Sequence, residues 1–114
     1  MWINCKIVSS NFLLYNKFKE FINQTPFFLL VEENMNFAED DQVIFWDIDS
    51  ININVSYFKE QIDKGSLIIV ISALLSKSMI SNLFEYDHAK IGTLNKNIPY
   101  PEFLEEISKI VDKL

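Results

Sequence analysis

Three polar residues with complementary chemistry stand where apolar runs of strand length come to an end. They are Asp47, Ser72 and Lys96. The carboxyl ends of parallel strands meet at the edge of a sheet where ligands bind, so the three side chains are expected to converge. There a carboxylate can act as a nucleophile toward a phosphoryl donor, a hydroxyl can hydrogen-bond a phosphoryl oxygen, and a lysine can neutralise developing charge. Taken singly, each has a plainer explanation, namely a turn, a helix cap and a solvated lysine.

The elements that must position these residues alternate along the chain between apolar runs and segments of helical spacing. The runs are apolar on successive positions, which predicts strands covered on both faces, as in a parallel sheet between helices. The predicted strands are Ile3 to Val8, Phe27 to Val31, Val43 to Ile48, Leu67 to Ile71 and Lys90 to Leu94.

Helical periodicity fills the intervals. The first helix has Ser10 or Asn11 as its cap and ends before Pro26, another ends at Gly65, and the last starts at Pro101. Helices are also expected over 75–84 and, as one or two turns, over 34–41. The sequence therefore predicts one α/β domain spanning 1–114, a doubly wound sheet of five parallel strands in the order 2-1-3-4-5, flanked by five helices.

Composition narrows the function classes. The chain has 114 residues, 49% of them apolar, and a net charge of −6, which disfavours nucleic acid and anionic membranes. Lys17 and Lys19, followed by Glu20, are interpreted as a solvated helix face. The single Cys5 is expected in the core and fits a reducing cytoplasmic location. No stretch is long and apolar enough for a membrane span.

Three segments together resemble the receiver domain of two-component response regulators. They are Ile44-Phe45-Trp46-Asp47-Ile48, Ser72-Ala73 and Leu94-Asn95-Lys96, and the order and spacing of the elements agree over essentially the whole chain. The resemblance implies a flavodoxin-like (CheY-like) fold and a part in phosphorelay signalling. It also implies that Asp47 is the phosphoacceptor, Ser72 the switch hydroxyl and Lys96 the conserved lysine of the family.

The chain departs from the family pattern at the position of its metal-binding acids. Two adjacent acids normally follow the first strand and hold Mg²⁺, and this chain has Ser9 and Ser10 there. Hydroxyls are poor ligands for a hard cation, which leaves Asp47 and Asp49 to form at most a weak Mg²⁺ site. Asp49 is expected either to turn toward this metal or, as we favour, to project into solvent. Phosphorylation should therefore be slowed.

Two further departures concern the last strand. The family has an aromatic switch residue where this chain has Thr93, and a proline after a cis peptide where it has Asn97. A cis bond to a residue other than proline costs about 3 kcal/mol, so Lys96 is expected to enter the site by a different backbone path. Transmission of a signal through a paired hydroxyl and ring is accordingly not expected.

The sequence leads to a receiver-like signalling domain that is not an enzyme, with Asp47 as an impaired phosphoacceptor and docking to a sensor kinase or other signalling protein as its output. The alternative is a phosphorylation-independent pseudo-receiver that serves as an adaptor or dimerisation module. A small flavodoxin-like enzyme is a third hypothesis and would require a bound cofactor. By analogy, the partner or a second copy would contact the face of the fourth helix, fifth strand and last helix, with Lys90, Thr93, Glu105, Lys109 and Asp112.

Overall fold

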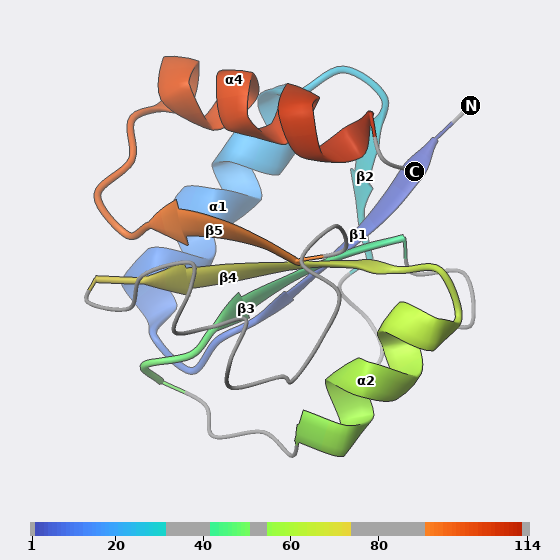
Figure 1. Cartoon of the computed structure of the whole chain (residues 1–114). Helices are drawn as coiled ribbons and strands as arrows, with labels where there is room; N and C mark the ends of the chain where they lie inside the picture. Colours follow the sequence, from blue (N-terminus) through green and yellow to red (C-terminus); the bar gives the residue numbers. More distant parts are fainter. Residues whose placement is uncertain (1, 32–41, 51–54, 74–90, 113–114) are drawn as a thin grey trace.

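Five parallel strands form one sheet between helices, as shown by the computed structural model in Figure 1. The structure describes residues 2–31, 42–50, 55–73 and 91–112. The elements are β1 Ile3–Val8, α1 Phe12–Gln24, β2 Phe28–Leu30, β3 Val43–Asp47, α2 Val55–Asp63, β4 Leu67–Ser72, β5 Ile91–Asn95 and α4 Tyr100–Val111. The helices expected over 34–41 and 75–84 lie outside the described residues.

The strands follow the order β2-β1-β3-β4-β5, which confirms the predicted doubly wound topology. All four neighbouring pairs are parallel. In this register Asp47 lies beside Ile71, and Ser72 lies beside Asn95. The carboxyl ends of β3, β4 and β5 therefore reach the same edge of the sheet, next to the end of β1.

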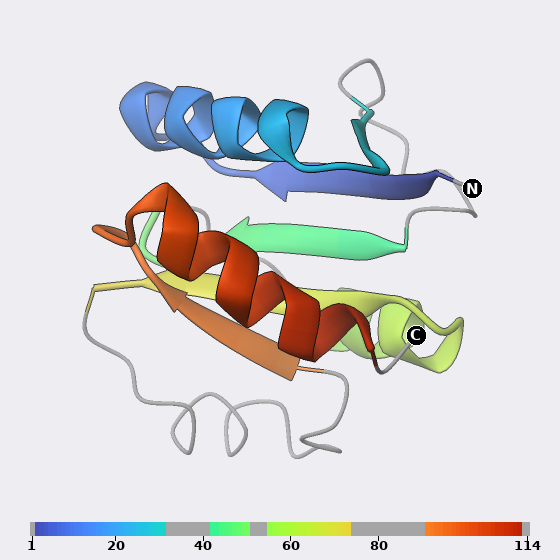
Figure 2. The ribbon, with the colours of Figure 1, turned by 90° about the horizontal axis from the view of Figure 1, so that it is seen from above.

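Alternate side chains of the strands feed two separate apolar cores. The core beneath α1 and α4 takes Phe45 and Ile69 from the central strands, while the core on the α2 side takes Trp46 and Val70. Seen from above in Figure 2, α1 and α4 lie side by side on the near face, and α2 lies behind the sheet. Because both faces are covered, the strands are apolar at successive positions rather than at every second one.

Local sequence signals set the ends of the helices. The side chain of Asn11 caps α1 by accepting a hydrogen bond from the Leu14 amide at 3.2 Å. Gly65 follows α2 with a φ of 102°, a conformation that glycine adopts without strain. Pro101 lies within the first turn of α4. Among the described residues, no helix is long and apolar enough to cross a membrane.

The larger core depends on Phe103 of α4, which is fully buried. Its ring lies 5.9 Å from the Phe45 ring of β3 and 5.1 Å from the Phe21 ring of α1, measured between centroids. Aromatic pairs at these separations stabilise a fold beyond the area that they bury. Phe103 thus joins the last helix to both the sheet and the first helix.

Replacing Phe103 by alanine is expected to lower the free energy of unfolding by about 3–5 kcal/mol, because the cavity left behind cannot collapse fully. The matched control is Phe12→Ala, which removes a ring that is 75% exposed and should change the stability by less than about 0.5 kcal/mol. Urea unfolding followed by circular dichroism measures both. Equal effects of the two substitutions would contradict this account of the core.

Candidate functional site

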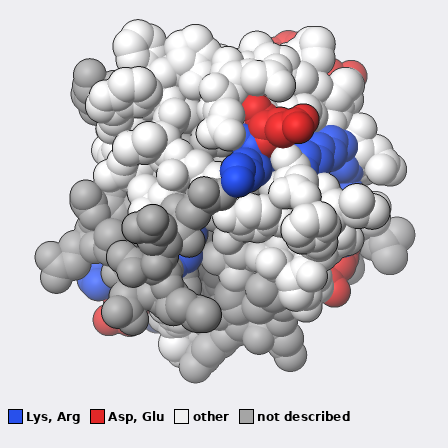
Figure 3. Space-filling view, turned by 180° about the vertical axis from the view of Figure 1, so that it is seen from behind, with Lys and Arg blue, Asp and Glu red and all other residues white. Residues whose placement is uncertain are grey.

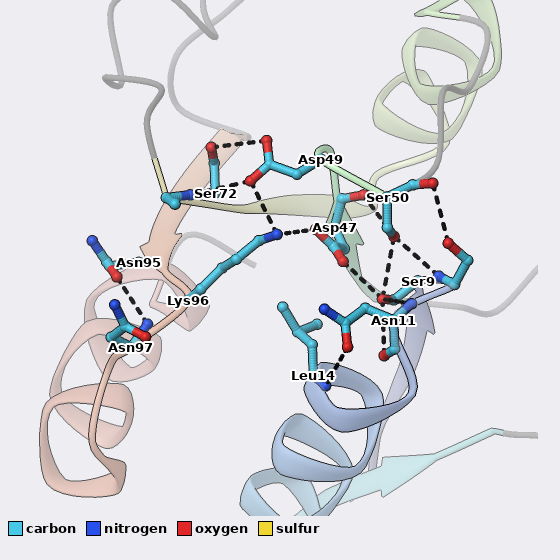
Figure 4. Close-up of polar contacts among 12 residues, drawn as sticks. Ser9, Asn11, Leu14, Asp47, Asp49, Ser50, Ser72, Asn95, Lys96 and Asn97 are labelled. Atoms are coloured by element: carbon cyan, nitrogen blue, oxygen red, sulfur yellow. Dashed lines mark hydrogen bonds and ion pairs between the residues drawn. The ribbon is translucent and has the colours of Figure 1, made fainter.

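Asp47 lies at the carboxyl end of β3 with no exposed surface. One carboxylate oxygen, Oδ2, accepts a hydrogen bond from the Ser9 hydroxyl at 2.8 Å. The other, Oδ1, forms an ion pair with the Lys96 ammonium at 3.3 Å, although the contact is not aligned as a hydrogen bond. Both oxygens are thus engaged by groups of the protein itself (Figure 4).

Lys96 supplies the positive charge of the site from the turn that follows β5. Its Nζ lies 3.3 Å from Asp47 Oδ1 and 3.1 Å from Asp49 Oδ2, so one ammonium bridges two carboxylates. Burial by itself would lower the pKa of Lys96, but the contacts with Asp49 and Asp47 outweigh burial and raise the pKa above its usual value. Lys96 therefore remains charged throughout the physiological range.

Asp49 is exposed to solvent, as the sequence favoured, but its carboxylate also contacts the site. In addition to its ion pair with Lys96, it accepts hydrogen bonds from the Ala73 amide at 3.3 Å and the Ser72 hydroxyl at 3.4 Å. Burial would raise the pKa of Asp49, but Lys96 and the Ala73 amide more than compensate, and the pKa lies below its usual value. Three strand ends thus meet at one carboxylate.

Two serines, Ser9 and Ser10, lie at the end of β1, where the receiver family has its pair of metal-binding acids. Ser9 contacts Asp47, as described above, and also accepts a hydrogen bond from the Asn11 amide at 3.1 Å. Ser10 is tied to the loop after β3, with its amide 3.0 Å from Ser50 Oγ and its hydroxyl 3.1 Å from the Ser50 carbonyl. The two serines therefore link β1 to the β3 loop by hydrogen bonds alone.

The donor set does not fit a magnesium ion well. In the described parts of the chain, no three His, Cys, Asp or Glu side chains gather into a group that could hold a metal. Asp47 and Asp49 share the Lys96 ammonium, and Ser9 engages the second oxygen of Asp47. A hard divalent cation would have to displace these contacts and find its remaining oxygen ligands elsewhere.

The structure brings together all the site residues named from the sequence, namely Asp47, Asp49, Ser72 and Lys96. Ser72 points toward Asp49, which the sequence did not indicate. The sequence also missed Ser50 and Lys17. Ser50 follows Asp47 and Asp49 in the same loop, which is a usable signal, whereas no pattern distinguished Lys17 from Lys19.

The interpretation of Lys17 as part of a solvated helix face is wrong. Its side chain is partly buried, and its Nζ donates a hydrogen bond to the backbone carbonyl of Lys96 at 2.6 Å. Burial lowers the pKa of Lys17. The sequence could not reveal this contact, because the two residues stand 79 positions apart.

The chemistry open to this arrangement follows from the engagement of Asp47. A carboxylate beside a lysine is the right combination for accepting a phosphoryl group, because the ammonium can neutralise the charge of the transferred group. Here the nucleophilic oxygens are committed to Ser9 and Lys96, and the carboxyl is fully buried. Acceptance would require those contacts to rearrange.

The low pKa of Asp49 means that its contribution to stability is present above its unfolded-state pKa of about 3.9 and is lost as the pH falls through the lower folded-state value. The substitution Lys96→Met should raise the pKa of Asp49, because the main stabilising charge is removed. Lys109→Met is the control, since Lys109 pairs only at the surface of α4, with Glu105 and Glu106. Carboxyl-carbon NMR titration measures the shift. An unchanged pKa in Lys96→Met would refute the assignment.

Comparison with solved structures places this geometry in context. No protein-family model and no curated protein matched the chain. The crystal structure of the response regulator ChrA in a heme-sensing two-component system superimposes with a TM-score of 0.71 at 12% identity. The match covers 98% of this chain and 58% of that regulator, so the chain spans little more than half of its length. The likeness shows a shared fold: the chain has the doubly wound architecture of this response regulator.

Proposed function

We propose that the chain is a receiver-like signalling domain of a two-component system that acts by docking to a protein partner, with Asp47 as an impaired phosphoacceptor. One observation carries the proposal. A buried carboxylate at the end of the central strand is held by a lysine from β5, while hydroxyls stand in place of the acids that would bind a metal. The fold shared with a response regulator supports the same proposal.

The phosphoacceptor is impaired for two physical reasons. Transfer of a phosphoryl group depends on cations to neutralise its equatorial oxygens, and Asp47 and Asp49 form at most a weak magnesium site. In addition, the Ser9 hydroxyl would have to release Asp47 Oδ2 before that oxygen could attack. The chain would then have no reaction of its own beyond slow acceptance of a phosphoryl group, and it would act as a signalling module rather than an enzyme.

Charge supports a protein partner, such as a sensor kinase, over nucleic acid. The net charge is −6, and on the face in Figure 3 acidic and basic side chains lie beside one another amid largely uncharged described surface. The proposed contact face includes Thr93 and the exposed side of α4, with Glu105, Lys109 and Asp112, whereas Lys90 lies outside the described residues. A homodimer through this face and a cytoplasmic location belong to the same proposal.

The alternative is a phosphorylation-independent pseudo-receiver that works as an adaptor or dimerisation module. The hydrogen bond from Ser9 to Asp47 favours it, because Ser9 binds one carboxylate oxygen and the Lys96 ammonium pairs with the charge of the other, without metal or phosphate. In that case Asp47→Asn would leave partner binding unchanged. A phospho-switch would instead make binding respond to the phosphoryl donor in the native chain and not in the variant.

Treatment with phosphoramidate and Mg²⁺ is expected to add about 80 Da, the mass of one phosphoryl group, slowly and to a minor fraction of the chains. Asp47→Asn should add nothing, because the neutral amide that replaces the carboxylate is too weak a nucleophile. Intact-mass spectrometry over time measures both. No adduct at saturating donor and metal would reject the phosphoacceptor role and leave the pseudo-receiver, whereas an adduct that survives in Asp47→Asn would place the modification elsewhere.

The double substitution Ser9→Asp/Ser10→Asp is expected to raise Mg²⁺ affinity at least about tenfold and to speed adduct formation, because it restores anionic ligands beside Asp47. Without metal, the new carboxylates should lower the melting temperature through repulsion, and Mg²⁺ should reverse that loss. The control Asn23→Asp/Ser108→Asp adds the same two charges at exposed helix positions. Equal responses of the two variants to Mg²⁺ would contradict the role given to Ser9 and Ser10.

A further inference from the structure

The turn between β5 and α4 must direct the Lys96 side chain across the edge of the sheet. Within the turn, the Asn97 amide donates to the Asn95 side chain at 2.8 Å and the Ile98 amide donates to the Asn95 carbonyl at 3.1 Å. Ile98 is buried beneath it. These contacts fix the two residues that follow Lys96, namely Asn97 and Ile98. The carbonyl of Lys96 takes part in neither contact.

Lys17 of α1 contacts that carbonyl from outside the turn. Its Nζ donates to the Lys96 carbonyl at 2.6 Å, a short hydrogen bond strengthened by the charge of the donor. The ammonium lies 5.8 Å from the centroid of the Phe18 ring and 5.6 Å from that of the Phe21 ring, which favours a cation in this partly buried place. The aliphatic stem can cover apolar surface while the head reaches the turn.

The position of the Lys96 backbone matters because the Lys96 ammonium must lie close to two carboxylates at once, those of Asp47 and Asp49. Nζ lies 3.3 Å from Asp47 Oδ1 and 3.1 Å from Asp49 Oδ2, while the lysine stem has several rotatable bonds. A shift of the Lys96 backbone would therefore have to be absorbed by that stem, at the cost of a changed rotamer or of a longer distance to one of the two carboxylates. Fixing the carbonyl of the same residue limits that shift.

We infer that Lys17 is a positioning residue: it holds the Lys96 backbone so that the Lys96 ammonium stays between Asp47 and Asp49. The described peptide bonds are all trans. The turn that carries Lys96 is thus held by a side chain of α1. The inference goes beyond the proposed function, because it concerns the free domain and holds whether or not Asp47 accepts a phosphoryl group.

NMR of the lysine ammonium groups tests the inference directly. An ammonium held in a buried ion pair exchanges its protons with water slowly, and the Lys96 signal is identified by its loss in Lys96→Met. In Lys17→Met we expect exchange of the Lys96 ammonium to accelerate at least about tenfold, because the ion pair opens more often. Lys17→Arg keeps a charged donor and should restore slow exchange.

Matched comparisons separate positioning from a general loss of stability. Lys19→Met removes a lysine of the same helix and should leave the Lys96 signal unchanged. An unchanged Lys96 exchange rate in Lys17→Met, even with a lowered melting temperature, would overturn the inference and leave Lys17 a purely structural role. So would a native Lys96 signal that exchanges as fast as that of Lys109, whose side chain is 63% exposed. If Lys17→Met does not fold, Lys17→Gln, whose amide is too short to reach the turn, carries the same comparison.

The measurement uses the native chain without phosphoryl donor, metal or partner. Failure to form a phosphoryl adduct would therefore leave the positioning role of Lys17 intact. Conversely, fast exchange of Lys96 in the native chain would overturn the positioning role without bearing on whether a partner binds.

Discussion

Neutralisation of the buried Asp47 carboxylate is the constraint on which the site depends. An ionised carboxylate without exposed surface is costly unless it is paired and hydrogen-bonded, and removing one partner of such a pair strongly destabilises a protein. Lys96 and Ser9 meet this requirement from β5 and the end of β1. Asp49, Ser72 and Lys17 make further contacts around this pair. The site therefore depends on the ends of β1, β3, β4 and β5 and on α1.

This arrangement changes what a receiver-like fold can do. The chain has hydroxyl groups where carboxylates could bind a divalent cation, and one of them, that of Ser9, contacts Asp47. The positive charge next to Asp47 is the ammonium of Lys96. In the described part of the chain, both oxygens of Asp47 are thus engaged by groups of the protein itself.

Much of the fold could be predicted because the signals are local. Apolar runs without alternation indicated strands buried on both faces, and the predicted bounds of Ile3 to Val8 are those of β1. Other strand ends moved by one residue: β5 begins at Ile91 and extends to Asn95, because hydrogen bonding with β4 continues there. Asn11, rather than Ser10, caps the first helix, since the Ser10 hydroxyl bonds to the Ser50 carbonyl.

By itself, the sequence determined the parallel strands and the convergence of Asp47, Ser72 and Lys96 on one edge, because apolar periodicity is a property of local composition. The strand order was predicted as a common doubly wound arrangement, which the structure confirms. Only the tertiary structure decided how those side chains pair. It paired the exposed Asp49 carboxylate with Lys96, placed the Ser9 hydroxyl against Asp47, and brought Lys17 to a carbonyl 79 residues away. The reason is physical: hydrogen bonds and ion pairs depend on distances of about 3 Å between atoms, which no pattern of residue types along the chain encodes.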